Sequence, residues 1–154
     1  MALNVVLVEP EIPHNTGSIA RTCALTGTAL HLVRPLGFSV DDKHMKRAGL
    51  DYWDLVEIYY YDSFEEVLNK YPEGYFYYAT TKTKKSYSDF IYKDNSFFVF
   101  GKETKGLPED LIAKNMDTAI RIPMKNIGRS LNLSNSANII LFEALRQLEF
   151  PGIM

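Results

Sequence analysis

The chain has 154 residues, 46% of them apolar, which is enough for one compact domain over residues 1–154 with a sizeable core. Its 17 basic and 19 acidic residues give a formal charge of -2, which excludes a surface that is basic throughout. The single cysteine, Cys23, excludes an intrachain disulfide framework, and the histidines at positions 14, 31 and 44 lack metal-ligand spacing, so no metal site is expected.

The N-terminal segment MALNVVLVEPE contains a short apolar run with no basic residues before it and Glu9 soon after it. We therefore predict a first strand at residues 4–8 rather than a signal peptide. No later stretch approaches membrane-spanning length, so we expect a cytoplasmic protein without a membrane partner. A helix is predicted at residues 15–26, because Gly27 supplies a typical helix end.

Short apolar runs then alternate with helical patterns along the chain. Strands are predicted at residues 30–33, 56–60, 75–79, 96–100 and 118–122, and several lack polar alternation, as expected when both faces are covered. Ser63 and Glu66 form a capping-box pattern before one helix, and Pro108 fits the first turn of another at residues 108–114. This alternation predicts an α/β fold with a mainly parallel sheet flanked by helices.

The last predicted helix, at about residues 134–148, has an unusually wide apolar arc. Residues 137, 140, 141, 144, 145 and 148 form an apolar stripe at helical spacing, and Ile139 and Phe142 widen it. Either this helix is deeply buried in its own domain or a second subunit covers the additional face. The sequence leaves both explanations open.

Three polar segments each follow a predicted strand, at the edge of an α/β sheet where ligands bind. In the first, PHNTGSIAR, Asn15 can cap the helix, Gly17 allows close approach, and Arg21 follows about one turn later. The alternative interpretation is that Asn15 is only a cap and Arg21 only a solvated helix residue.

The second segment, FVFGKETKGLP, has the strand, loop and helix layout of a phosphate cradle. However, Leu107 and Pro108 stand where the Walker pattern requires Lys and then Ser or Thr, and Glu103 would repel a triphosphate. The third segment, IPMKNIGRSLNLSNSAN, carries more hydrogen-bonding side chains than a helix cap requires. We expect the three loops to converge on a pocket for a ligand that is not strongly anionic.

In this order the three segments resemble the three motifs of the SPOUT RNA 2′-O-methyltransferases. The matching residues are Asn15, Gly17 and Arg21; Phe100, Gly101, Glu103, Gly106 and Leu107; and Ile122, Pro123 and Met124 followed by Ser130, Leu131, Asn132, Ser134 and Asn135. Within that family, the segments EPEIPHNTG, KRAGLDYW and RSLNLSNSAN are most similar to the enzymes that act on the wobble nucleotide of tRNA.

The resemblance implies S-adenosylmethionine as cofactor, a C-terminal trefoil knot, a homodimer and the tRNA anticodon stem-loop as substrate, with cytidine or a modified uridine as target. S-adenosylmethionine has no phosphates, so the missing Walker residues are no defect. The residues implied for cofactor binding are Ala79, Gly101, Gly106, Ile122, Met124, Ser130 and Leu131. Those implied for catalysis are Arg21, as a clamp for the phosphate and 2′-oxygen, and Asn15, Glu103, Ser130 and Asn132, which orient the assembly.

Substrate RNA also requires basic groups. The candidates are Lys43, Lys46, Arg47, Lys82, Lys125 and Arg129, although each set taken alone also fits a solvated face. Two further functions stay open: 2′-O-methylation of another tRNA or rRNA nucleotide, and a non-catalytic module that binds the cofactor and RNA.

Overall fold

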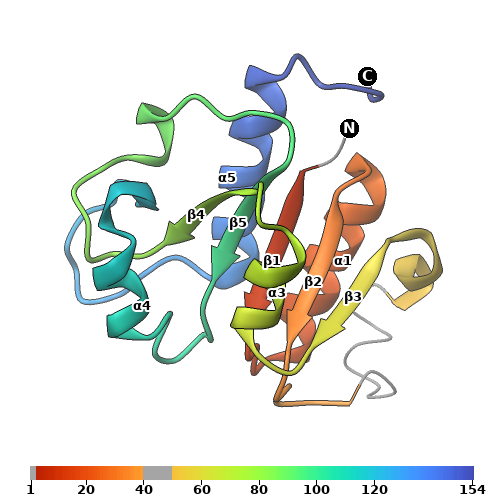
Figure 1. Ribbon diagram of the computed structural model, residues 1–154, viewed down its shortest axis with the longest axis horizontal. Helices are drawn as coiled ribbons and strands as arrows, with labels where there is room; N and C mark the ends of the chain where they lie inside the picture. Colours follow the sequence, from red (N-terminus) through yellow and green to blue (C-terminus); the bar gives the residue numbers. More distant parts are fainter. Residues whose placement is uncertain (1–2, 40–49) are drawn as a thin grey trace.

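A computed structural model describes residues 3–39 and 50–154 and contains a six-stranded sheet in which every pairing is parallel (Figure 1). The sheet order is β3-β2-β1-β5-β4-β6. The strands are β1 (Asn4–Val8), β2 (Ala29–Val33), β3 (Ile58–Tyr61), β4 (Tyr75–Ala79), β5 (Ser96–Phe100) and β6 (Ala119–Ile120). The predicted parallel α/β sheet is confirmed.

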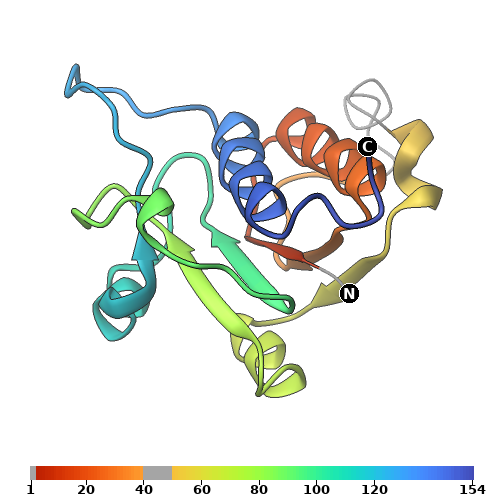
Figure 2. The ribbon, with the colours of Figure 1, turned by 90° about the horizontal axis from the view of Figure 1, so that it is seen from above.

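Helices cover both faces of the sheet. Figure 2 shows α1 (Pro13–Thr26) and α5 (Leu133–Gln147) side by side on one face, with α3 (Phe64–Lys70) and α4 (Glu109–Lys114) on the other. Three short 3-10 helices complete the described elements: η1 (Leu50–Leu55), η2 (Tyr87–Asp89) and η3 (Met116–Thr118). Two hydrophobic clusters result, one on each side of the sheet.

The uninterrupted apolar runs follow from this double coverage. In β1, Val5 and Leu7 belong to the cluster under α1 and α5, whereas Val6 and Val8 belong to the cluster on the other face. Successive side chains of a strand point to opposite faces, so a strand buried on both faces is mostly apolar and has no position that faces water. All five residues of β1 are accordingly buried.

Several predicted boundaries are wrong by a few residues. The strand predicted at 56–60 begins only at Ile58, and the one predicted at 118–122 shrinks to Ala119–Ile120, because Met116–Thr118 forms η3 instead. The capping box at Ser63 is half formed: the Ser63 hydroxyl accepts from Glu66 N, but the Glu66 carboxylate accepts from Asp62 N.

The first helix begins at Pro13, two residues earlier than predicted, because proline suits the first helical turn. Asn15 therefore lies inside α1 and is not its cap. Ile12 occupies the cap position and makes no side-chain capping bond. The helix start consequently needs a hydrogen-bond acceptor from elsewhere in the chain.

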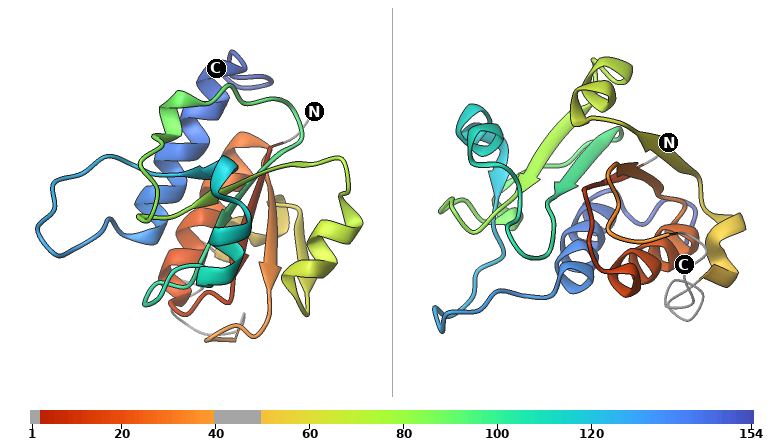
Figure 3. Two further views of the ribbon diagram at one scale, coloured as in Figure 1. Left: turned by 60° about the vertical axis from the view of Figure 1, so that its left-hand side comes forward. Right: turned by 90° about the horizontal axis from the view of Figure 1, so that it is seen from below.

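The wide apolar arc of α5 is only partly covered by the rest of the chain. Ile140 and Leu141 are buried, whereas Ile139 and Phe142 keep 37% and 44% of their surface exposed. Deep burial of the whole arc in its own domain is therefore wrong. The segment 121–132, which precedes α5, extends away from the sheet before it returns (Figure 3).

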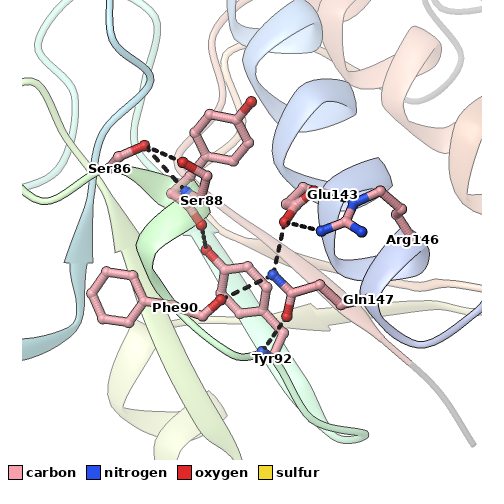
Figure 4. A network of polar contacts seen from close by, with 8 residues as sticks. Ser86, Ser88, Phe90, Tyr92, Glu143, Arg146 and Gln147 are labelled. Carbon is pink, nitrogen blue, oxygen red and sulfur yellow. Dashed lines mark hydrogen bonds and ion pairs between the residues drawn. The ribbon is translucent and has the colours of Figure 1, made fainter.

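A polar network ties the second half of α5 to the connection between β4 and β5 (Figure 4). The Gln147 amide nitrogen donates to Phe90 O at 2.9 Å, and its amide oxygen accepts from Tyr92 N at 2.8 Å. Glu143 accepts from Gln147 and, through two bonds of 2.8 and 3.0 Å, from Arg146. These bonds fix the axial position of α5, and with it the residues at its other end.

A buried histidine gives the fold a pH dependence. His31 in β2 is fully buried, with Nε2 at 2.9 Å from Asn4 Oδ1 and Nδ1 at 2.9 Å from the Tyr61 hydroxyl. Burial, together with the positive charge of Lys70, lowers the pKa of His31 to about 4. The ring is therefore neutral in the folded protein at neutral pH.

We expect acid to destabilise the protein through His31. Between an unfolded pKa of 6.5 and a folded pKa of about 4, the unfolded chain binds a proton that the folded chain does not. The contribution is fully present above the upper value and falls by about 3 kcal/mol as the pH drops to the lower one. We expect the His31→Gln variant to lack this loss. In urea unfolding at a series of pH values, the difference in free energy of unfolding between the wild type and the variant should therefore narrow in acid. A gap that stays constant with pH would contradict the assignment.

Candidate active site

A cavity of about 430 Å³ opens at the carboxyl ends of β4, β5 and β6. Its walls come from residues 79–82, 100–107, 120, 122, 124, 130–133 and 136, together with Ile12, Asn15 and Ile140. This volume is within the range of small-molecule sites, and the position is the usual ligand edge of an open parallel sheet. The three polar segments singled out in the sequence therefore do meet at one cavity.

The loop at residues 101–107 folds back on itself and needs glycine at two places. Gly106 N donates to Lys102 O at 2.8 Å, and Gly106 itself has a φ of +69°, which glycine adopts without strain. A Cβ at Gly101 would lie only 2.0 Å from the carbonyl carbon of Gly106. Gly101 therefore permits the close backbone approach, and Gly106 permits the turn.

A chain of hydrogen bonds links all three polar segments along one wall. Asn132 Nδ2 donates to Asn15 Oδ1 at 3.0 Å, and Asn15 Nδ2 donates to Glu103 Oε2 at 3.2 Å. The two oxygens of Glu103 also accept from Glu11 N and Ile12 N, both at 2.8 Å. Glu103 thus binds the two backbone N–H groups just before α1 and places its negative charge near the start of the helix, where such a charge is favourable. Asn15 is almost completely buried within this chain of bonds.

Asn132 also caps α5. Its Oδ1 accepts from Ser134 N at 2.8 Å, Asn135 N at 3.2 Å and the Ser134 hydroxyl at 2.7 Å. The crowding of polar residues in the third segment is explained by these two tasks, because one amide both starts a helix and holds it against α1. A simple capping loop would account for the three bonds that Asn132 Oδ1 accepts, but not for the bond that Asn132 Nδ2 donates to Asn15.

A reciprocal pair of contacts fastens the loop at 101–107 to the segment before α1. Thr104 donates to Glu11 Oε1 from its backbone N at 3.0 Å and from its hydroxyl at 2.8 Å, and these bonds lower the pKa of Glu11. In return, the Glu103 carboxylate accepts hydrogen bonds from the backbone N of Glu11 and of Ile12. We call the group of Glu11, Ile12, Glu103 and Thr104 the clasp. Sequence reasoning missed Glu11 and Thr104, although both stand inside the quoted segments.

The cavity brings together most of the residues proposed from sequence. All seven cofactor candidates line it, as do Asn15, Glu103, Ser130 and Asn132. Arg21 does not: it lies six residues beyond Asn15, about 9 Å along α1, with an exposed side chain. Thr80 and Thr81, which directly follow β4, line the cavity and were missed, although the rule that ligands bind after parallel strands would have found them.

The basic candidates are dispersed. Lys82 lies on the cavity wall and pairs with Glu109 at 2.8 Å, while Lys125 and Arg129 are exposed on the segment before α5. Lys43, Lys46 and Arg47 lie outside the described residues. Within residues 3–39 and 50–154, His, Cys, Asp and Glu side chains form no cluster of three that could hold a metal ion. No helix in that part of the chain is long and apolar enough to cross a membrane.

Comparison with known proteins identifies the family. The profile of the SpoU rRNA Methylase family matches residues 2–142. The chain belongs to the SpoU methylase family. A relative from Geobacillus stearothermophilus is 56% identical to this SpoU chain, over 99% of this chain and 99% of its own length. A relative from Yersinia pestis is 44% identical, over 99% of this chain and 98% of its own length. The Yersinia pestis relative is named tRNA (cytidine(34)-2'-O)-methyltransferase.

Solved SpoU-type structures agree with this membership. A structure described as giving insight into the 2-OH methylation of C/U34 on tRNA is 39% identical, with a TM-score of 0.91 over 96% of this chain and 97% of that one. An rRNA methyltransferase from Sinorhizobium meliloti, solved with AdoMet bound, is 26% identical, with a TM-score of 0.84 over 96% of this chain and 57% of its own. The fold is therefore that of the SPOUT methyltransferases.

Proposed function

We propose that this protein transfers a methyl group from S-adenosylmethionine to the ribose 2′-hydroxyl of tRNA nucleotide 34, the wobble position. The observation that carries the proposal is the bonded chain Asn132–Asn15–Glu103, which joins three sequence segments along the wall of one cavity. The name of the Yersinia pestis relative and the C/U34 structure support the nucleotide.

The cavity fits S-adenosylmethionine. Its walls combine apolar side chains, such as Leu107, Ile120 and Ile140, with backbone at Ala79, Gly101 and the segment 130–132, which suits an adenosine body. The close packing at Gly101 leaves no room for a side chain there and exposes loop backbone to the ligand. When bound, the cofactor supplies an electrophilic methyl group. The AdoMet-bound Sinorhizobium meliloti structure supports this assignment.

The residues of the chain act mainly by positioning. Both oxygens of Glu103 accept hydrogen bonds that hold the start of α1, so we assign it to fixing the wall rather than to removing the 2′-hydroxyl proton. Arg21, a guanidinium without an acceptor, binds the phosphate and the 2′-oxygen of the target nucleotide and stabilises developing negative charge. The proton then passes to phosphate or water. Ser130, exposed at the rim, helps to orient the ribose.

We propose a homodimer through the face formed by α1 and α5. Leu25 on α1 is 61% exposed, and it shares this layer with the exposed Ile139 and Phe142 of α5 (Figure 2). A two-fold dimer would cover these apolar side chains with their own symmetry mates. It would also bring Arg21, on the same helix, toward a cavity of the partner subunit.

Phe142→Asp is expected to convert the dimer largely to monomer. Burying a carboxylate at the centre of an apolar interface should raise the dimer dissociation constant by about 30-fold or more, the effect of a 2 kcal/mol hot spot. Light scattering over a concentration series measures the shift, with Phe142→Leu as the control that keeps the interface apolar. A wild-type chain that is monomeric and fully active would overturn the dimer.

We further infer that the C-terminal segment forms a trefoil knot. Residues 121–132 make a long excursion beyond β6, and α5 then packs against β5 and α1, away from the β6 edge (Figure 3). The bond from Gln147 to Phe90 and the bond from Tyr92 N to Gln147 tie α5 to the β4–β5 connection, which supports this inference. A crystallographic trace in which this segment passes outside the preceding loops would contradict the knot.

The clasp should matter for cofactor binding. Thr104→Val removes the hydroxyl that donates to Glu11, so the loop at 101–107 loses one charge-assisted bond. We expect S-adenosylmethionine affinity to fall by about fivefold, with little change in global stability because Thr104 is exposed. Calorimetry measures the affinity, and Thr104→Ser, which keeps the hydroxyl, should bind like the wild type. Equal weakening by both substitutions would indicate that shape, not the bond, holds the loop.

One assay tests the proposed function directly. The protein is incubated with labelled S-adenosylmethionine and total tRNA, and the 2′-O-methylated nucleotide is mapped. Methylation at nucleotide 34 is the expected result. Methylation elsewhere would favour the alternative substrate, and cofactor binding without turnover on any RNA would favour the non-catalytic module.

A further inference from the structure

A second cavity lies beside the first. It has a volume of about 470 Å³ and opens between the carboxyl end of β1 and the start of α4, beside the β5–α4 loop. Five residues line both cavities: Lys82, Lys102, Lys105, Gly106 and Leu107. The loop at 101–107 is therefore a shared wall, with one cavity on each side.

The second cavity carries an excess of positive charge. Its lining contains three lysines and two glutamates, although the whole chain has a formal charge of -2. Lys82 pairs with Glu109 at 2.8 Å, and Lys102 pairs with Glu9 at 3.5 Å. Within residues 3–39 and 50–154, the ammonium of Lys105 makes no ion pair or hydrogen bond. Lys105 also acts electrostatically on the Glu11 carboxylate, but without an ion pair or hydrogen bond to it, so its ammonium can still bind an anionic ligand.

Two further features suit an anion that arrives from solvent. The Glu109 side chain is 85% exposed, and an exposed ion pair is worth little, so Lys82 can exchange this partner for another anion. The inner wall, formed by the buried Val8 and Leu107, offers no competing carboxylate. Glu9, which pairs with Lys102, has a φ of +54°, a conformation that non-glycine residues adopt mostly where the surroundings require it.

We propose that the second cavity binds a backbone phosphate of the substrate RNA, adjacent to the nucleotide that is methylated. This inference rests on the proposed function, because an RNA whose ribose enters the first cavity can place a neighbouring phosphate across the shared wall, in the second cavity. Lys105 binds the phosphate, and Lys82 joins it after leaving Glu109. Such contacts release counterions, so they strengthen binding without reading sequence.

The test uses fluorescence anisotropy with a labelled anticodon stem-loop RNA over a salt series. Lys105→Ala is expected to weaken RNA binding by about threefold to tenfold and to reduce the salt slope by about one. Lys105→Arg keeps the charge and should retain the slope. Glu109→Gln frees Lys82 from its partner and should tighten binding by about twofold to fivefold, a change opposite in sign.

Lys93→Ala is the matched control. Lys93 precedes β5 at the other end of the sheet, with its ammonium 5.2 Å from the Tyr75 ring centroid, and its replacement should leave RNA affinity unchanged. If Lys105→Ala behaves like this control, the inference is wrong. If calorimetry shows that Lys105→Ala loses as much S-adenosylmethionine affinity as RNA affinity, the second cavity belongs to the cofactor and the inference is also wrong.

Failure of the proposed function would look different. If the wild-type protein binds the RNA with a Lys105-dependent salt slope but transfers no methyl group to any tRNA, the phosphate site is supported and the proposed enzymatic function is wrong. If the wild-type protein methylates nucleotide 34 but its RNA affinity does not depend on Lys105 or Glu109, the proposed enzymatic function is supported and the phosphate site is wrong.

Discussion

Replacing Gly101 with alanine is expected to abolish cofactor binding. The new Cβ would lie 2.0 Å from Gly106 C and 2.1 Å from Leu107 N, and both are backbone atoms that cannot rotate away. Relief requires the loop to open, which breaks the bond from Gly106 N to Lys102 O and removes the shared wall of both cavities. We expect S-adenosylmethionine affinity to fall by about 100-fold or more and stability by about 2–4 kcal/mol.

Gly106→Ala is the matched control in the same loop. A Cβ at Gly106 meets nothing within 4 Å, so its effect comes only from the φ of +69°. That strain costs about 1 kcal/mol and should weaken binding by no more than about tenfold. Calorimetry with S-adenosylmethionine and urea unfolding compare the two variants. Similar affinities for both would show that the loop tolerates opening and that the tight approach at Gly101 is not needed.

The sequence predicted the sheet well because burial on both faces leaves a local signal. The mostly apolar runs at β1 and β5 match the structure residue for residue, since no position in either strand faces water. Convergence of the three polar loops also followed from local information, because the carboxyl ends of parallel strands share one edge. The strand predicted at residues 118–122 was too long, because β6 has only two residues and Arg121 makes only an isolated bridge with Ser86.

The errors arose where distant segments decide local structure. Asn15 resembled a helix cap, but α1 begins at Pro13, and the Asn15 side chain bonds instead to Glu103 and Asn132, both far away in sequence. No local pattern reports such distant partners. The second cavity was missed for the same reason, because its lysines become neighbours of Glu9 and Glu109 only after the chain folds.

Arg21→Ala is expected to reduce turnover by about 100- to 1000-fold, the usual effect of removing one charge-stabilising donor. Cofactor affinity should change by less than about twofold, because Arg21 does not line the cavity. Its side chain is exposed on α1, so stability should stay within about 0.5 kcal/mol. Arg21→Lys keeps the charge but not the planar fork and should recover only part of the rate. Equal losses of cofactor affinity and rate would place Arg21 on the cofactor instead.

The position of Arg21 also predicts which cavity it serves. Asn15 lies on the wall of its own cavity, but Arg21 is about 9 Å further along α1, in the layer that carries the exposed Leu25 and Phe142. We propose that in the dimer Arg21 serves the cavity of the partner subunit. Mixing Arg21→Ala with Asn132→Ala protomers, each nearly inactive alone, should then restore up to about a quarter of wild-type turnover, because half of the dimers hold one intact site. If Arg21 serves its own cavity, every mixed site lacks one component and turnover stays at the level of the separate variants.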